Sequence, residues 1–279
     1  MLQIYDQISR DLSRNITKSY STSFSLAVKM VSPSIRDHIY NIYGFVRLAD
    51  EIVDTFHNHN KERLLHDLER DMWLSINEGI SINPVLHSFQ DTVRKFDIEN
   101  ELISAFLKSM KMDLIKSDYS TFQEYEEYIY GSADVVGLMC LKVFVKGNNE
   151  LYEELKYSAM KLGSAFQKVN FLRDFKHDME GLERSYFPNI SVNIMSGESK
   201  KEIIAEIESD FVEAFKGIIK LPAEARFGVY TAYRYYKTLL NKLKETPFEK
   251  LSEQRVRVGN HVKLSILARS FVRIRLNIL

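Results

Sequence analysis

The chain has 279 residues, of which 45% are hydrophobic and 12% aromatic, and only 11 glycines and 5 prolines interrupt it. This composition excludes a disordered chain and favours a large, mostly helical core. The 38 basic and 38 acidic side chains cancel, so no overall charge indicates a nucleic-acid partner.

Apolar residues recur at helical spacing along most of the chain, and no stretch alternates as a strand does. The predicted helices cover residues 6–19, 21–30, 34–57, 61–78, 83–96, 99–117, 122–130, 138–146, 151–180, 201–220, 222–243 and 252–279. Gly131 and Gly137 are expected to interrupt or soften the passage between two of them, and residues 182–200, with Pro188 and Gly197, to form an irregular connector or lid. The sequence therefore predicts one all-α domain over residues 1–279.

Several other features indicate in which cellular compartment the protein is expected. The single cysteine, Cys140, cannot form an intrachain disulfide or a thiolate metal cage, and we expect it in the core. Residues 1–6 do not resemble a secretory signal, and no uninterrupted apolar run approaches the roughly 18–20 residues that span a bilayer. We expect a cytoplasmic protein that is soluble or touches the inner face of the membrane.

One predicted helix carries two carboxylates on the same face. Tyr43, Arg47, Asp50 and Asp54 fall within roughly 60° of one another around its axis, with the two aspartates one turn apart. Glu51 points about 100° away from Asp50. The pattern also suits an ordinary surface stripe, in which Arg47 pairs with a neighbouring carboxylate.

A second predicted helix has two polar faces separated by aromatic residues. One face carries Gly163, Gln167, Asn170, Asp174 and Asp178. Lys161 and Lys168 lie nearly opposite. A surface helix needs only one polar face, so one is expected to meet solvent and the other something internal. Buried carboxylates are costly unless they are paired or bind metal, and two oxygen-rich faces suit Mg²⁺, with Mn²⁺ as the alternative.

Over residues 17–263 the chain resembles the squalene/phytoene synthase family in several motifs that follow the family's order. Residues 19–24 are similar to its Ser-x-Ser-Phe element, and the stripe from Tyr43 to Asp54 to its first aspartate-rich motif. Residues 128–137 resemble its Tyr-Cys-…-Ala-Gly-x-Val-Gly segment, except that Ile129 stands for Cys and Asp134 for Gly. The later matches are Gln167, Asn170, Arg173, Asp174 and Asp178, then Arg184, Tyr186 and Pro188, then Tyr236, Arg255 and Lys263.

The resemblance implies an isoprenoid-synthase-type helical bundle with a central cavity. It assigns metal binding and catalysis to Asp50, Asp54, Asn170, Asp174 and Asp178, with Arg47 beside them. It assigns substrate binding to Ser21, Ser23, Phe24, Tyr43, Arg47, Tyr128, Ala133, Gly137, Gln167, Arg173, Arg184, Tyr236 and Arg255. Phe166 and Phe171 are further candidates for the wall, and Gly137 and Gly163 are expected to leave room for prenyl chains.

The implied reaction joins two geranylgeranyl diphosphates head to head, through a cyclopropylcarbinyl (prephytoene) diphosphate, to give phytoene with Mg²⁺ and without NADPH. Farnesyl diphosphate is the alternative substrate, giving dehydrosqualene or squalene. An alternative of another class is a catalytically silent assembly subunit, although both acidic motifs are intact. The last alternative is a helical interaction protein without catalytic activity. Substrate length depends on the floor of a cavity whose residues the sequence does not identify.

The tail over residues 262–279 combines apolar residues with Lys263, Arg269, Arg273 and Arg275. Such a basic amphipathic helix either rests on an anionic bilayer or packs on the core as the last helix.

Overall fold

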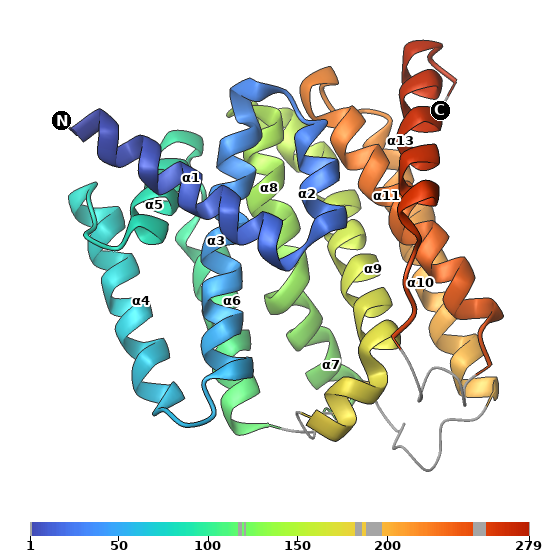
Figure 1. Cartoon of the computed structure of the whole chain (residues 1–279), viewed down its shortest axis with the longest axis horizontal. Coiled ribbons are helices and arrows are strands. Elements are labelled where there is room, and N and C mark those ends of the chain that lie inside the picture. Colours follow the sequence, from blue (N-terminus) through green and yellow to red (C-terminus); the bar gives the residue numbers. More distant parts are fainter. Residues whose placement is uncertain are drawn as a thin grey trace.

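The computed structural model describes residues 2–116, 119, 121–181, 186–187, 197–247 and 255–278, with the backbone alone for residues 175–181 and 197. These residues form helices and no strand, which confirms the all-α prediction (Figure 1). The first helices are α1 (Leu2–Tyr20), α2 (Thr22–Lys29), α3 (Pro33–Thr55), α4 (Lys61–Glu78), α5 (Pro84–Phe96) and α6 (Asn100–Ile115). They are followed by α7 (Phe122–Ile129), η1 (Tyr130–Asp134), α8 (Val135–Val145), α9 (Asn149–Gly181), α10 (Gly197–Ile218), α11 (Ala223–Glu245) and α13 (Asn260–Arg275).

The helix ends follow local chemistry. The side chains of Ser21, Asn60 and Thr121 accept hydrogen bonds from backbone N–H groups in the first turns of α2, α4 and α7, groups that would otherwise lack a partner. Pro33 occupies the first turn of α3, where its missing N–H costs nothing. Gly79 ends α4 in a left-handed conformation with φ of 75°, which favours glycine.

Gly131 softens the passage without breaking it, because α7, η1 and α8 form one helical run in which η1 is a π-helical turn, and Gly137 lies within α8. Two of the predicted boundaries are wrong. Helix α10 begins at Gly197, within the segment predicted to be irregular. The last helix begins at Asn260 rather than at residue 252, since residues 255–259 lie outside any helix.

Most helices stand side by side, and α1 packs on α5 and crosses α3 near its middle, where Ser13 meets Gly44 (Figure 1). Phe45 on α3 stacks on Phe89 of α5 with ring centroids 4.1 Å apart, and its edge meets Phe106 of α6. This packing fixes α3, the helix of the first two carboxylates. On its other side, α9 packs against α8 and α10, while α11 contacts α2, α9 and α13.

Within the described residues, Phe122–Val145 is long and apolar enough to cross a membrane by length and composition. Charged residues such as Asp134 and Lys142 interrupt the stretch, so it is not an uninterrupted apolar run. Because 67% of its apolar window is buried inside the bundle, the stretch also has the character of a core helix.

Candidate active site

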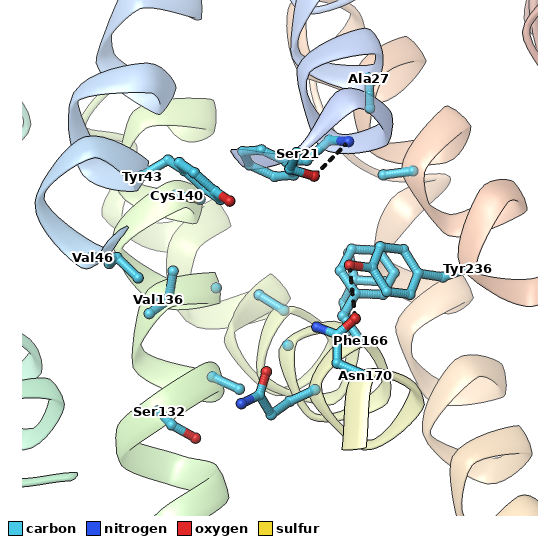
Figure 2. Close-up of a pocket in the computed structure, with 18 of the residues that line it drawn as sticks. Ser21, Ala27, Tyr43, Val46, Ser132, Val136, Cys140, Phe166, Asn170 and Tyr236 are labelled. Carbon is cyan, nitrogen blue, oxygen red and sulfur yellow. Dashed lines mark hydrogen bonds between the residues drawn. The ribbon is translucent and has the colours of Figure 1, made fainter. Parts of the chain in front are cut away.

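Residues of α1, α2, α3, α6, α7, η1, α8, α9, α10 and α11 line a cavity of about 510 Å³. Figure 2 shows the walls facing one another, with Tyr43 and Val46 on one side, Phe166 and Asn170 on the other, and Tyr236 beside them. The carboxylates and arginines of α3 and α9 line one part. The remaining lining is mostly apolar, and it includes Val28, Val31, Leu155, Ala159, Ile218, Leu221 and Val229.

Asp50 and Asp54 present the carboxylates of α3 to this cavity. Burial, and then the charge of Asp54, raise the pKa of Asp50 to about 7, so without a cation this carboxyl group keeps its proton up to near-neutral pH. Arg47 lies 3.8 Å from Asp50, pairs with Glu51, and stacks over the Tyr20 ring at 4.3 Å. The α3 wall thus combines two acids with a guanidinium group held by other partners.

Asn170 and Asp174 face the cavity from α9. The hydroxyl of Tyr236 donates to Asn170 Oδ1 at 3.4 Å, and its ring stacks on Phe166 with centroids 4.0 Å apart. Two arginines hold Asp174. Arg173 Nε donates to Oδ1 at 3.0 Å, and Arg255 Nε lies 2.6 Å from the same oxygen. Arg255, from the segment before α13, therefore closes one side of the site.

The donor atoms on both walls are oxygens of carboxylates and an amide, which hard cations such as Mg²⁺ prefer. Among the described side chains, no three acidic, imidazole or thiolate groups converge closely enough to bind one ion by themselves. Mg²⁺ is usually held by one or two carboxylates together with water and substrate phosphates. The residues present therefore fit Mg²⁺, which Asp50 and Asp54 would hold on one wall and Asn170 and Asp174 on the other.

Asp113, a cavity-lining carboxylate on α6, is not among the site residues predicted from the sequence. The hydroxyl of Tyr128 donates to its Oδ2 at 2.8 Å, and that of Tyr119 to its Oδ1 at 3.0 Å. Burial, and then Asp113, raise the pKa of Tyr128, so this phenol stays a neutral donor. Tyr186 completes the cluster by stacking on Phe171 with ring centroids 4.0 Å apart. The sequence feature that could have identified Asp113 is its position as a single acidic residue on the face of α6 that also carries the buried Phe106 and Met110.

Most of the predicted site residues line this one cavity. They are Ser21, Phe24, Tyr43, Arg47, Asp50, Asp54, Tyr128, Ala133, Gly137, Gln167, Asn170, Arg173, Asp174, Tyr236 and Arg255. Ser23 does not; it lines a separate small hollow together with Lys263. The side chain of Asp178 and the whole of Arg184 lie outside the described residues.

Gly137 and Gly163 allow η1 and α8 to approach α9 closely. A Cβ atom on Gly137 would lie 2.8 Å from the carbonyl oxygen of Ala159, and one on Gly163 would lie 2.6 Å from that of Ala133. Both glycines also line the cavity, and the expectation that they leave room for prenyl chains stays a prediction.

The lysine face of α9 is not a solvent face, contrary to the sequence expectation. Lys168 is only 4% exposed, and its Nζ lies 2.6 Å from Asp210 Oδ2 on α10. Lys161 reaches the other oxygen of Asp210 at 2.9 Å. Asp134 accepts a hydrogen bond of 2.6 Å from Ser164 next to this cluster and does not line the cavity. Its carboxylate therefore belongs to the packing behind the wall.

Comparison with known proteins agrees with this architecture. Residues 17–192 match the sequence profile described as squalene/phytoene synthase. A phytoene synthase from Arthrospira platensis is 27% identical over 291 residues, covering 96% of this chain and 94% of the relative. Phytoene synthase 3 from Zea mays is 27% identical over 92% of this chain, which spans 64% of that protein's length. The chain belongs to the squalene/phytoene synthase family.

Solved structures support the fold. The crystal structure of a dehydrosqualene synthase in complex with ligand has a TM-score of 0.83 and 22% identity, covering 98% of each chain. Squalene synthase HpnC from Alicyclobacillus acidocaldarius has a TM-score of 0.75 and 19% identity, covering 86% of this chain and 95% of that one. At these identities the likeness shows the isoprenoid-synthase-type fold alone.

Proposed function

We propose that this chain is a prenyltransferase that condenses two geranylgeranyl diphosphates head to head to phytoene, with Mg²⁺ and without NADPH. The observation that carries the proposal is a single cavity in which two oxygen-rich walls and several arginines adjoin a long apolar lining. A prenyl diphosphate has the same division between a charged head and an apolar chain. The resemblance in sequence to phytoene synthases supports the choice of the C20 substrate.

The polar end would hold the diphosphates. Asp50, Asp54, Asn170 and Asp174, with Asp178 as the motif implies, would bind Mg²⁺, which neutralises the charge that develops on a departing diphosphate. Arg47, Arg173 and Arg255 would bind phosphate oxygens. For Arg173 and Arg255 this means exchanging Asp174 for the substrate, because both pair with that carboxylate in the free protein.

The apolar part would protect the cations that follow. Loss of diphosphate from the first substrate leaves an allylic cation, which the alkene of the second captures; the resulting tertiary cation then loses a proton as the ring closes to the cyclopropylcarbinyl diphosphate. Water must be kept out, and π faces stabilise positive charge. The stacked pair Phe24 and Tyr43, with ring centroids 4.9 Å apart, and the pair Phe166 and Tyr236 supply such faces on opposite walls. A second ionisation and loss of a proton would then give the linear product.

Product analysis tests the proposal. Purified protein with Mg²⁺ is incubated separately with geranylgeranyl and farnesyl diphosphate, with and without NADPH, and extracted hydrocarbons are identified by mass. We expect phytoene from geranylgeranyl diphosphate without NADPH. A C30 hydrocarbon alone would keep the reaction class but overturn the substrate.

Asp50→Asn and Asp174→Asn separate the enzyme from a silent assembly subunit. Each should lower turnover about 100-fold or more, because the stabilisation of transition-state charge by a bound metal ion is worth several kcal/mol. Asp71→Asn on α4, where the carboxylate is 49% exposed, is the matched control and should keep full activity. If the folded wild-type protein makes no hydrocarbon from either substrate, the assembly-subunit alternative gains support.

A further inference from the structure

The proposed reaction releases a proton into the cavity when the tertiary cation closes to the cyclopropane ring. The apolar part of the cavity keeps water away, so the proton passes either to a group of the protein or to the departing diphosphate. A protein group that accepts it must line the cavity and present a basic atom there. Carboxylates meet this requirement at near-neutral pH.

Four carboxylates line the cavity within the part of the chain that the structure describes, and three of them already have a role. Asp50 and Asp54 form the acidic wall of α3 that would bind Mg²⁺, and Asp174 pairs with two arginines. The Cys140 thiol also lines the cavity, but burial raises its pKa to about 12, so it stays protonated and is not a base. The fourth carboxylate, Asp113 on α6, remains as the candidate acceptor.

Two phenols orient the Asp113 carboxylate. The residue is 8% exposed. The Tyr128 hydroxyl donates to its Oδ2 at 2.8 Å and the Tyr119 hydroxyl to its Oδ1 at 3.0 Å, and the centroids of the two rings are 4.5 Å apart. Hydrogen bonds donated to a carboxylate favour its charged form. The pair of phenols therefore keeps Asp113 in the state that can take up a proton.

Tyr128 connects this carboxylate to the cavity. It lines the cavity, and its ring stacks on those of Tyr186 and Phe171 with centroids 5.3 and 6.1 Å away. A phenol has one proton and two lone pairs. Because the proton of Tyr128 is donated to Asp113, its oxygen has lone pairs left as acceptors for a group in the cavity. Burial raises the pKa of Tyr128, so the phenol gives up its proton only as it gains another.

From this geometry we infer that Asp113 is the final acceptor of the proton released at ring closure, which reaches it through Tyr128. The inference rests on the proposed function. The carbon–hydrogen bond of the tertiary cation breaks, its electron pair closes the cyclopropane ring, and the proton binds the Tyr128 oxygen. Tyr128 passes its own proton to Oδ2 of Asp113, so the phenol stays neutral and the carboxylate becomes a carboxylic acid. The charge of the cation and that of Asp113 cancel, and the acid loses its proton to solvent after product release. Asp113 acts through Tyr128 and is a positioning residue in this sense.

Asp113→Asn tests the inference, because the amide oxygen still accepts from a phenol but takes up no proton. With geranylgeranyl diphosphate and Mg²⁺, kcat should fall about 100-fold or more while KM stays within about twofold of the wild-type value. Tyr128→Phe should lower kcat by a similar factor, and the double variant should lose no more, since the two residues act as a unit. The thermal shift caused by inorganic pyrophosphate and Mg²⁺ should persist in all three variants.

Tyr119→Phe is the matched control, because it removes a phenol from the same carboxylate and leaves the path through Tyr128 intact. Its kcat should stay within about fivefold of the wild-type value, the worth of one hydrogen bond. Asp113→Ala leaves a space beside Tyr128 in which formate can accept the proton, so added formate should raise the kcat of this variant about tenfold or more. Circular dichroism should show that all variants are folded.

The inference is overturned if Asp113→Asn keeps kcat within about fivefold of the wild-type value, because the departing diphosphate would then be the acceptor. It is also overturned if kcat and the pyrophosphate shift are lost together, or if formate does not activate Asp113→Ala, because Asp113 would then have only a structural role. These results all require a wild type that forms product. A folded wild type that forms no hydrocarbon would overturn the proposed function, and this inference with it.

Discussion

Asp134 places a carboxyl group in the interior behind the cavity wall. It is 8% exposed and accepts a hydrogen bond from the buried Ser164. Burial is the largest influence on it and raises its pKa to about 6, while Ser164, Lys168 and Lys161 act in the opposite direction.

The raised pKa makes stability depend on pH in a defined direction. Below about pH 4 the carboxyl group is protonated in both the folded and the unfolded chain, and it has no effect. Between about pH 4 and pH 6 the folded state binds more protons than the unfolded state, so the free energy of unfolding falls as pH rises. A pKa about 2 above the ordinary value corresponds to about 3 kcal/mol.

Asp134→Asn should remove this dependence, since the amide oxygen can still accept from Ser164. We expect the free energy of unfolding of the variant, relative to that of the wild type, to rise by about 3 kcal/mol from pH 4 to pH 7. Urea unfolding at a series of pH values measures this difference. Glu202→Gln, at an exposed position on α10, controls for the loss of one negative charge. Parallel pH profiles for wild type and Asp134→Asn would contradict the prediction.

Close approach between helices shapes the cavity at the scale of elements. Gly163 lies on α9 where the carbonyl group of Ala133 in η1 comes nearest, and a Cβ there would be 2.6 Å from the oxygen and 3.0 Å from the carbon. Backbone atoms cannot move aside as a flexible side chain can. Helix α9 would have to shift away from η1, and with it the wall that carries Asn170 and Asp174.

Gly163→Ala should therefore destabilise the fold by about 1–3 kcal/mol, as overpacking of a core does. Thermal or urea unfolding measures the loss. Gly259→Ala is the control, because a Cβ at that position meets only the ring of His261, a side chain that can rotate. Equal stability of Gly163→Ala and wild type would show that η1 and α9 are not held this close.

Helical periodicity predicted most of the elements because each buries a recognisable apolar stripe. The start of α10 was missed, since Gly197 in a segment rich in Ser and Asn indicates a loop by local rules. The two carboxylate faces could be found from spacing and motif order. Their meeting in one cavity was an expectation of the resemblance rather than of the spacing. The environments of Asp113 and Lys168 could not be predicted, because their neighbours belong to other helices. The face of α9 alone does not show that Asp210 of α10 neutralises Lys168.

At the scale of the whole molecule, the proposed metal and diphosphate site joins two parts of the bundle. Asp50 belongs to α3, which packs with α1 and α5, and Asp174 belongs to α9, which packs with α8 and α10. In the free protein the charge of Asp174 is balanced by Arg173 and Arg255, whereas Arg47 lies 3.8 Å from Asp50, and burial and the charge of Asp54 raise the pKa of Asp50. A ligand that contacts both walls would stabilise the folded state through one shared binding site.

Inorganic pyrophosphate with Mg²⁺ supplies that bridge without a prenyl chain or turnover. At about 100 times its dissociation constant, a ligand that binds only the folded state adds about 2.7 kcal/mol, which for a chain of this size raises Tm by about 5 °C. If the two walls form one site, Asp50→Asn or Asp174→Asn alone should abolish most of the shift in differential scanning fluorimetry, and the double variant should lose no more. Asp71→Asn should keep the whole shift. Single variants that each retain about half of it, with losses that add in the double variant, would mean two independent sites and would refute a shared diphosphate centre between α3 and α9.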